Sequence, residues 1–380
     1  MASDDEPRFT LKSFFSPAIV KRLAADLVRA EPTFASRAFV TRATKGLDRL
    51  ELLDRGKHIA AALAAHLPAD YPRAIDILLR SLGPTHTKDE NTGHGMAPFF
   101  YLPHTQFVVA HGLEHFDVSM RANHELTKRF TAEFSMRPFI DRDPERTFAV
   151  LRGWARDPDA HVRRLVSECT RPRLPWAMRV PWLDANLTRV VELLALLRDD
   201  TSTMVRRSVA NNLNDISKLD AKLASDTCRA WLAGSDAPEM RALVEHALRS
   251  AVKRGDADAL GVLGFGRSSS VRVENVRFSP ARVAIGRRVK MTFDLVSTAR
   301  TVQRLNVDTA VHFVKADKTT RPKVFKLRRV ELAPRGRLAL ETSYSLAVHT
   351  TRKPRPGIHA VDVIVNGIAV SAGSFHVIAR

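Results

Sequence analysis

Apolar residues recur at steps of three and four through the first two thirds of the chain, which is the spacing of one face of an α-helix. Within residues 47–67 they lie at Leu47, Leu50, Leu53, Ile59, Leu63 and Leu67. The same periodicity predicts further helices over residues 18–29, 71–82, 105–120, 184–198, 202–217 and 240–253. Because strand patterns are weak up to about Gly266, we expect this part of the chain to be all-α.

One sequence pattern occurs twice in the helical part, 43 residues apart. The segment DPDAHVRRLVSE begins at Asp157 and DTSTMVRRSVAN begins at Asp200, so Arg163–Arg164 matches Arg206–Arg207. A weaker third copy begins at Asp236. Repeats of about 35–45 residues with two helices each are typical of HEAT-type α-solenoids, whose concave face offers a groove to a partner. We therefore expect a solenoid of HEAT-like repeats, and an irregular helical bundle is the alternative.

The pattern changes after the Gly- and Ser-rich stretch at residues 261–270, which we interpret as a linker. The runs beyond it alternate between apolar and polar residues and predict strands over residues 271–278, 287–296, 306–314, 323–332, 338–346, 357–367 and 374–379. About seven strands in about 110 residues are typical of an immunoglobulin-like β-sandwich, although the cysteine pair of antibody domains is absent. We expect a helical domain of HEAT-like repeats over residues 1–266 and an immunoglobulin-like domain over residues 267–380.

Positive charge is concentrated in the predicted sandwich. The chain has 60 Lys and Arg against 41 Asp and Glu, a net charge of +19. Residues 267–380 hold 22 of the basic and 7 of the acidic residues, so +15 of that charge lies there. Such a patch suits a polyanion, because each neutralised phosphate releases condensed counterions. The alternative is a solvated basic surface that only favours solubility. A membrane partner is not expected, since we find no long basic amphipathic helix.

Several classes of protein and site lack support in the sequence. No apolar run approaches the ~20 residues of a membrane span, and the first residues are acidic and polar where a signal peptide is basic and then apolar. The two cysteines, Cys169 and Cys228, fit a reducing cytosol. His111 and His115 do not form the HExxH zinc arrangement, and we find no P-loop, dinucleotide fingerprint or nucleophile elbow. We expect a cytoplasmic protein without metal or cofactor.

Two prolines directly after the first repeat require a loop over residues 170–176. This loop presents Arg171, Arg173 and Trp176. It follows the helix end that carries Glu168. Arginine suits phosphate groups, and an indole suits the face of a sugar or a base. The alternative is that Trp176 fills the core between repeats and that the arginines are only solvated.

The second repeat contains a cluster of poor helix formers, namely Asn211, Asn212, Asn214 and Asp215. Asp215 also lies near the helix C-terminus, where the helix dipole disfavours an anion by a few tenths of a kcal/mol. Local rules are broken most often at functional sites, so this segment is a candidate site. A side-chain network that joins adjacent repeats is the alternative. Glu133 is a weaker candidate, since it could simply pair with Arg137 at i+4.

Three segments carry a resemblance to a known family: FSMRPFI (residues 134–140), GWARDPDAHVRRLVSECTRPRLPW (153–176) and VRRSVANNLNDISK (205–218). They resemble the HEAT-like-repeat DNA alkylation repair glycosylases of the AlkC type, whose longer members end in an immunoglobulin-like domain. The resemblance extends over almost the whole chain. It departs from the family pattern at Cys169, where a glycine is expected.

The resemblance implies excision of cationic alkylated bases, such as 3-methyladenine and 3-methylcytosine, in base excision repair without flipping of the target base. By motif, Glu133, Glu168 and Asp215 match the family's active-site carboxylates, and Trp176 matches its active-site aromatic residue. The residues that we expect to bind DNA are Trp154, Arg163, Arg164, Arg171, Arg173, Arg206 and Arg207. The implied partner is double-stranded DNA with alkylated bases, bound by a monomer.

The chemistry of the substrate agrees with this set of residues. An N-alkylated base is cationic and leaves as a neutral molecule, so the enzyme must stabilise oxocarbenium character on the sugar and position a water. We assign these tasks to Glu168 and Asp215, a supporting role to Glu133, and stacking against the sugar to Trp176. The alternative function is a non-catalytic HEAT-repeat scaffold that binds nucleic acid. Release of free base from methylated DNA would discriminate between the two.

Overall fold

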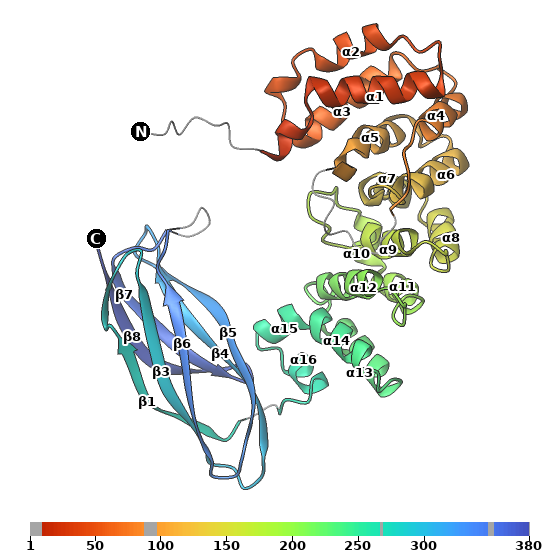
Figure 1. The fold of residues 1–380 in the computed structure, drawn as a ribbon. Helices are drawn as coiled ribbons and strands as arrows, with labels where there is room; N and C mark the ends of the chain where they lie inside the picture. Colours follow the sequence, from red (N-terminus) through yellow and green to blue (C-terminus); the bar gives the residue numbers. More distant parts are fainter. Residues whose placement is uncertain (1–9, 87–96, 267–268, 349–352, 380) are drawn as a thin grey trace. The chain divides into compact units, whose positions relative to one another are not determined.

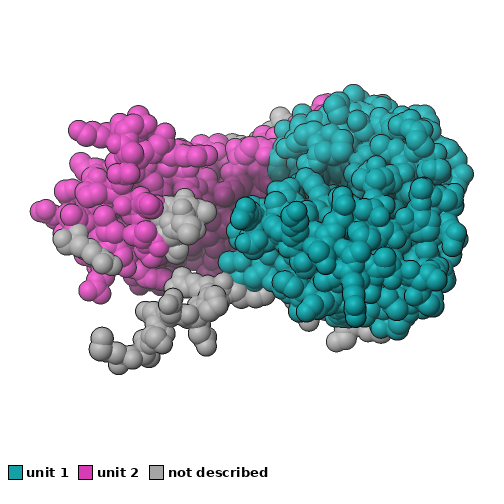
Figure 2. All heavy atoms as spheres, turned by 90° about the horizontal axis from the view of Figure 1, so that it is seen from above, with its two compact units in different colours: residues 1–219, 236–247 teal, residues 220–235, 248–380 magenta. Residues whose placement is uncertain are grey.

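A computed structural model describes residues 10–86, 97–266, 269–348 and 353–379. The chain forms two compact units (Figure 2). The first comprises Met1–Leu219 and Asp236–Ala247, and the second comprises Asp220–Ser235 and Leu248–Arg380. No helix within the described ranges has the length and apolar character that crossing a bilayer requires. The predicted fold class, helical repeats followed by an immunoglobulin-like sandwich, is confirmed; the domain boundary at Gly266 stays a prediction.

The first unit consists of helices stacked in chain order (Figure 1). Its α-helices are α1 (Pro17–Ala30), α2 (Ser36–Thr44), α3 (Leu52–Ala64), α4 (Tyr71–Arg80), α5 (Leu102–His111), α6 (Phe116–Thr127), α7 (Glu133–Arg142), α8 (Pro144–Trp154), α9 (Ala160–Cys169), α10 (Pro181–Ala185), α11 (Leu187–Ala195), α12 (Thr203–Ile216) and α14 (Pro238–Ala247). Short 3-10 helices are η1 (Leu11–Phe14), η2 (Leu47–Arg49) and η3 (Ala97–Tyr101).

The helix predicted over residues 105–120 is in fact two helices, α5 and α6. They are separated at Gly112, the C-terminal cap of α5. A Cβ atom at this position would lie 2.4 Å from Ser119 Oγ and 2.4 Å from the Tyr71 hydroxyl, so only glycine fits here. The periodicity of apolar residues continues across the break, which is why the sequence pattern did not reveal it.

The three copies of the sequence repeat form α9, α12 and α14, which pack against each other in that order. Arg163 of α9 binds Asp200 at the start of the next copy, with Nε 2.6 Å from Oδ2 and Nη2 3.0 Å from Oδ1. The Asp200 carboxylate also accepts the Ser202 backbone N–H, as Asp157 accepts that of Asp159. The shared spacing of Asp and Arg in the two copies thus places a bidentate ion pair between neighbouring repeats.

The second unit combines α13 (Ala221–Ala233), α15 (Arg249–Lys253) and α16 (Ala257–Val262) with a β-sandwich. Its strands are β1 (Val271–Ser279), β2 (Arg282–Ala284), β3 (Arg288–Ser297), β4 (Gln303–Val314), β5 (Thr320–Leu332), β6 (Arg337–Ser345), β7 (Gly357–Val365) and β8 (Ile368–Ile378). One sheet has the order β1-β3-β6 and the other β2-β8-β7-β4-β5. All pairs are antiparallel except β2 with β8.

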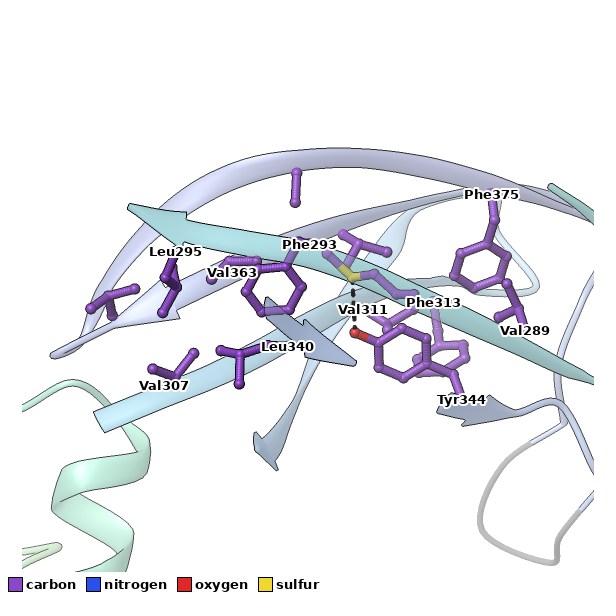
Figure 3. Packing of buried hydrophobic residues seen from close by; sticks show 14 of the residues in the cluster. Val289, Phe293, Leu295, Val307, Val311, Phe313, Leu340, Tyr344, Val363 and Phe375 are labelled. Atoms are coloured by element: carbon purple, nitrogen blue, oxygen red, sulfur yellow. Dashed lines mark hydrogen bonds between the residues drawn. The ribbon is translucent and has the colours of Figure 1, made fainter. Parts of the chain in front are cut away.

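Inward-facing residues of both sheets form the core of the sandwich, in which alternate residues of β3 and β7 are buried (Figure 3). Tyr344 of β6 is fully buried there, and its hydroxyl lies 3.5 Å from Met291 Sδ. The sequence pattern did not predict the short strand β2, and it extended the strand that begins at Gly357 two residues too far. The structure ends β7 at Val365, places a turn at Asn366 and Gly367, both with positive φ, and begins β8 at Ile368.

Residues 261–266 of the predicted linker are part of the folded structure. Helix α16 extends to Val262, and Phe265 is buried beneath the guanidinium groups of Arg304 and Arg329. At the turn before α16, Gly255 meets Gly367 of the β7–β8 turn so closely that a Cβ on Gly255 would lie 2.9 Å from Gly367 Cα. The turn before α16 and the residues that follow this helix are therefore packed directly on the sandwich.

The burial of His104, in α5, leads us to expect that the protein loses stability in acid. The ring is buried, and neither of its nitrogens has a hydrogen-bond partner in the part of the chain that the structure describes. Burial lowers the pKa of His104 to about 4. Because the unfolded chain binds this proton near pH 6.5, the free energy of unfolding should fall by at most about 3 kcal/mol as the pH drops from 6.5 to 4.

Urea unfolding of the wild type and of His104→Leu at several pH values measures this effect. The variant should lose less stability in that pH range than the wild type. Parallel curves for the two proteins would show that the buried ring does not titrate with folding.

Candidate active site

Three carboxylates and three cations form an alternating chain in the first unit. Consecutive polar atoms lie 2.8–3.7 Å apart in the order Glu133, Arg164, Glu168, Arg171, Asp215 and Lys218. Helices α7, α9 and α12 supply the carboxylates, and the loop after α9 supplies Arg171. The structure therefore brings together all three carboxylates that the sequence singled out.

Glu168 occupies the centre of this chain. Its Oε1 accepts a hydrogen bond from Ser208 Oγ at 2.9 Å, and its Oε2 accepts one from Arg171 Nη1 at 3.0 Å. Arg164 Nη2 lies 3.7 Å from Oε1. The residue is only 4% exposed, and a carboxylate at this depth requires such partners. Its position and orientation are thus determined by two hydrogen-bond donors, Ser208 and Arg171, and by the nearby charge of Arg164.

Asp215 lies near the C-terminal end of α12 and is 1% exposed. Arg171 Nε donates to its Oδ2 at 2.9 Å, and Lys218 Nζ donates to its Oδ1 at 2.8 Å. These two cations offset the unfavourable helix dipole that the sequence indicated. The same Arg171 side chain contacts Glu168, so it bridges two carboxylates and fixes them relative to each other.

Glu133 is the first residue of α7, where the helix dipole favours an anion. Its Oε2 accepts hydrogen bonds from Thr131 Oγ1 at 2.7 Å and from Arg164 Nη1 at 3.3 Å. Burial raises the pKa of Glu133, an effect that Arg164 opposes and the charge of Glu168 reinforces. The alternative pairing of Glu133 with Arg137 is wrong, because Arg137 donates to backbone carbonyls of the following loop instead.

A cavity of about 440 Å³ adjoins the chain of charges. Glu133, Glu168, Arg164 and Arg171 form the acidic and basic part of its lining. Most of the remaining lining is apolar and aromatic, with Phe99, Phe130, Phe134 and Trp176. Asp215 is not among the lining residues and acts on the cavity through Arg171. The cavity can therefore hold an apolar or planar group beside two carboxylates.

Trp176 belongs to the loop that the prolines predicted. Its side chain is 66% exposed and lines the cavity, so the alternative that it fills the core between repeats is wrong. The backbone at Trp176 has a φ of 63°, a left-handed conformation that is uncommon for a bulky residue. Such strain occurs most often where a site requires a particular side-chain direction.

The arginines expected to bind DNA fall into different environments. Arg163 binds Asp200 of the next repeat with a side chain only 14% exposed, whereas Arg206 donates to the backbone carbonyl groups of Asp200 and Thr201 in the turn of its own repeat. Arg173 pairs with Asp184 at 2.8 Å. Arg207 is exposed in a second cavity, of about 520 Å³, between α12 and α14. Their contacts with DNA stay predictions, and Arg207 is the best placed of them.

Two further predicted features are resolved by their contacts. Trp154 ends α8 outside the cavity lining, with its ring 5.5 Å from that of His124. Asn212 donates to Ser167 O at 2.8 Å and to Thr170 Oγ1 at 3.1 Å. The Asn-rich segment of α12 thus joins adjacent repeats, as the alternative held, while it also contributes Asp215 to the chain of charges.

Sequence reasoning missed several residues of this site. Lys218 stands three residues after Asp215, a spacing that places both on one helical face and could have revealed the pair. Ser208 and the contacting side chains of Phe99 and Phe130, with ring centroids 5.3 Å apart, carry no local signal. They reach the site only through the packing of distant segments.

Comparisons with known proteins show which family the whole chain resembles. Residues 272–379 match the family model of the YhaZ C-terminal immunoglobulin-like domain. The uncharacterised protein YhaZ of Bacillus subtilis is 32% identical over 97% of this chain and 99% of its own length. The alkylpurine DNA glycosylase AlkC of Pseudomonas fluorescens, solved with DNA containing an abasic site analogue, superimposes with a TM-score of 0.88. The chain is 32% identical to AlkC, and the alignment covers 98% of this chain and 100% of AlkC.

The chain belongs to the AlkC and YhaZ family. The resemblance inferred from the three sequence motifs is thereby confirmed over almost the full length. Within the described residues, we find no group of three or more His, Cys, Asp or Glu side chains that could hold a metal ion.

Proposed function

We propose that this protein is a monomeric DNA glycosylase that hydrolyses the N-glycosidic bond of cationic alkylated bases, such as 3-methyladenine and 3-methylcytosine, without flipping the base. The observation that carries this proposal is that Glu168, Glu133 and the exposed Trp176 line the same cavity. This arrangement occurs in a chain similar over its whole length to a glycosylase that was solved on abasic DNA.

The substrate determines what the protein must contribute. A base that carries a positive charge after alkylation leaves as a neutral molecule, so its departure needs no general acid. Positive charge develops on the deoxyribose as the bond breaks, and water must then attack the anomeric carbon. The reaction therefore requires fixed negative charge near the sugar and a base that orients one water.

Glu168 meets both requirements. It lines the cavity with its carboxylate fixed by Ser208 and Arg171, so little reorganisation is needed when charge develops nearby. A carboxylate about 4 Å from the developing cation is worth at most about 4 kcal/mol at an effective dielectric of about 20, or roughly a thousandfold in rate. The neighbouring cations Arg164 and Arg171 reduce this value, because they partly neutralise the charge of the carboxylate.

Trp176 has the exposure and the position that stacking against the lesion requires. An indole face next to a cationic sugar contributes about 0.5–2 kcal/mol. The same loop holds Arg171, so the aromatic group and the bridge between Glu168 and Asp215 come from one short segment.

Release of free base tests the proposal directly. Duplex DNA carrying a single 3-methyladenine is incubated with excess protein, and the released base and the abasic site are both quantified. We expect release well above the spontaneous rate, with DNA lacking the lesion unchanged. Tight binding of the same duplex without any release would favour the non-catalytic scaffold.

The raised pKa of Glu133 predicts a pH dependence of the rate. Since burial favours its neutral form, Glu133 should lose its charge at a higher pH than an ordinary glutamate. Base release should therefore fall as the pH is lowered towards about 5, and Glu133→Gln should be slower but flatter on the acid side. Single-turnover rates of both proteins from about pH 5 to 8, corrected for spontaneous loss, measure this. An equal decrease in rate at low pH in both proteins would contradict the attribution of this pH dependence to Glu133.

A further inference from the structure

Arg137 is the largest side chain that is fully buried in the described part of the chain, and its partners are backbone carbonyls. Its Nε donates to Met178 O at 2.7 Å, and its Nη1 donates to Cys169 O at 3.0 Å and to Arg171 O at 2.9 Å. No carboxylate of the described residues forms an ion pair with it. A buried guanidinium that donates hydrogen bonds to three backbone carbonyls of one segment fixes the backbone conformation of that segment.

The segment to which Arg137 donates these hydrogen bonds runs from the end of α9 to Met178 and contains both Arg171 and Trp176. Its own backbone supplies little order, because its turns depend on long hydrogen bonds, such as Arg171 N to Glu168 O at 3.3 Å and Ala177 N to Leu174 O at 3.4 Å. Pro172 and Pro175 have no N–H to donate. The conformation of this loop therefore depends on side chains that bind its carbonyls from outside.

Two of the carbonyls that accept hydrogen bonds from Arg137 belong to Cys169 and Arg171. Cys169 directly follows the central carboxylate Glu168 in the sequence, and Arg171 is its ion-pair partner. The side chain of Arg171 bridges Glu168 and Asp215, so a shift of its backbone would move that bridge. Met178 lies two residues after Trp176, whose backbone is held at a φ of 63°. Arg137 thus holds the loop on both sides of the cavity-lining indole.

We propose that Arg137 is a positioning residue for the reaction. It acts through the loop of residues 169–178, setting the place of the Arg171 bridge and the direction of the Trp176 ring. This inference rests on the proposed glycosylase function. It assigns a role in catalysis to a residue one helical turn from Glu133 that does not contact the cavity.

Arg137→Lys tests the proposal, because lysine keeps the charge but cannot reach three divergent carbonyls with one ammonium group. We expect single-turnover base release to fall by about ten- to a hundredfold, while the affinity for the lesion duplex changes less than about threefold. Arg55→Lys is the matched control. Arg55 is also buried and donates to four backbone carbonyls, but these lie in η1, η2 and their flanks, outside the loop.

The control variant should lose stability and keep the wild-type rate in its folded fraction. An equal loss of rate in both variants would overturn the proposal, since it would reflect general destabilisation. A wild-type rate in folded Arg137→Lys would also overturn it. If Arg137→Lys does not fold, Arg179→Met serves in its place, because exposed Arg179 donates to Pro172 O of the same loop at 2.7 Å. A two- to fivefold decrease supports the proposal, and no decrease overturns it.

A spectroscopic readout separates this inference from the proposed function. Subtracting the fluorescence emission of a Trp176→Phe variant from that of the same protein with Trp176 intact leaves the emission of Trp176 alone. We expect acrylamide quenching of this Trp176 emission to differ between the wild type and Arg137→Lys. The Arg55→Lys background should leave this difference spectrum unchanged. If the wild type releases no base from any alkylated duplex, the glycosylase proposal fails, and the quenching result still shows whether Arg137 orders the loop.

Discussion

Asp215→Asn and Glu168→Gln are each expected to slow base release by about ten- to a thousandfold. Both changes remove one negative charge with almost no change in shape, and this range corresponds to a loss of about 1.4–4 kcal/mol of transition-state stabilisation. Affinity for DNA should be unchanged or slightly higher, because a charge that repels phosphate is gone. The effect should be smallest on the bases that leave most readily, since they need the least help.

The structure sharpens this expectation for each residue. Glu168 lines the cavity, whereas Asp215 reaches it through Arg171, so Glu168→Gln should have the larger effect. Asp26→Asn is a suitable control, because Asp26 is a buried carboxylate paired with Arg29 in α1, outside the cavity. Single-turnover release from 3-methyladenine DNA is compared with binding for all variants. Wild-type release from both active-site variants would remove the catalytic assignment and favour a scaffold.

Neutralising the basic edge of the sandwich is expected to weaken DNA binding and to reduce its dependence on salt. Strand β5 is the outer strand of its sheet, and residues 315–329 hold seven Lys and Arg against one Asp. Arg321, Lys326 and Arg328 are exposed on it. Replacing these three by Gln should lower the slope of log affinity against log salt by up to about 3, because each phosphate that is no longer neutralised reduces the slope by about 1.

The matched control changes the same amount of charge elsewhere on the sandwich. Arg277, Arg287 and Arg288 are exposed on β1 and around the start of β3, in the other sheet. Their replacement by Gln should leave the salt slope closer to that of the wild type. The rate of base release at saturating protein should be unaffected in both triple variants. Equal slopes in all three proteins would mean that the charge of the sandwich serves solubility alone.

Much of the fold was predictable because it follows from periodicity. The repeat of Asp157 and Asp200 predicted the packing of α9 on α12, and the change in pattern after residue 266 predicted the sandwich. The break at Gly112 and the short strand β2 could not be predicted, since each depends on a contact with a distant segment. Gly112 is required by the Tyr71 hydroxyl, and β2 exists only by pairing with β8.

The site could be predicted in part for a similar reason. Glu133, Glu168 and Asp215 were marked by motif and by broken helix rules, and they do form one network. The order of that network was not predictable, because Arg164 and Arg171 stand between the carboxylates only once α7, α9 and α12 are packed. Arg163 was expected to bind DNA, but its side chain binds Asp200. The sequence alone does not distinguish an arginine that faces a groove from one that forms an ion pair within the protein.

The chain passes between the two compact units three times, since residues 220–235 belong to the second unit and residues 236–247 return to the first. A single cut therefore cannot yield two complete units. A gene shortened at Gly266 would retain α13, α15 and α16 but lose the strands that cover Phe265 and meet Gly255. A fragment meant to carry the complete immunoglobulin-like part would therefore have to begin before α15 rather than at residue 267.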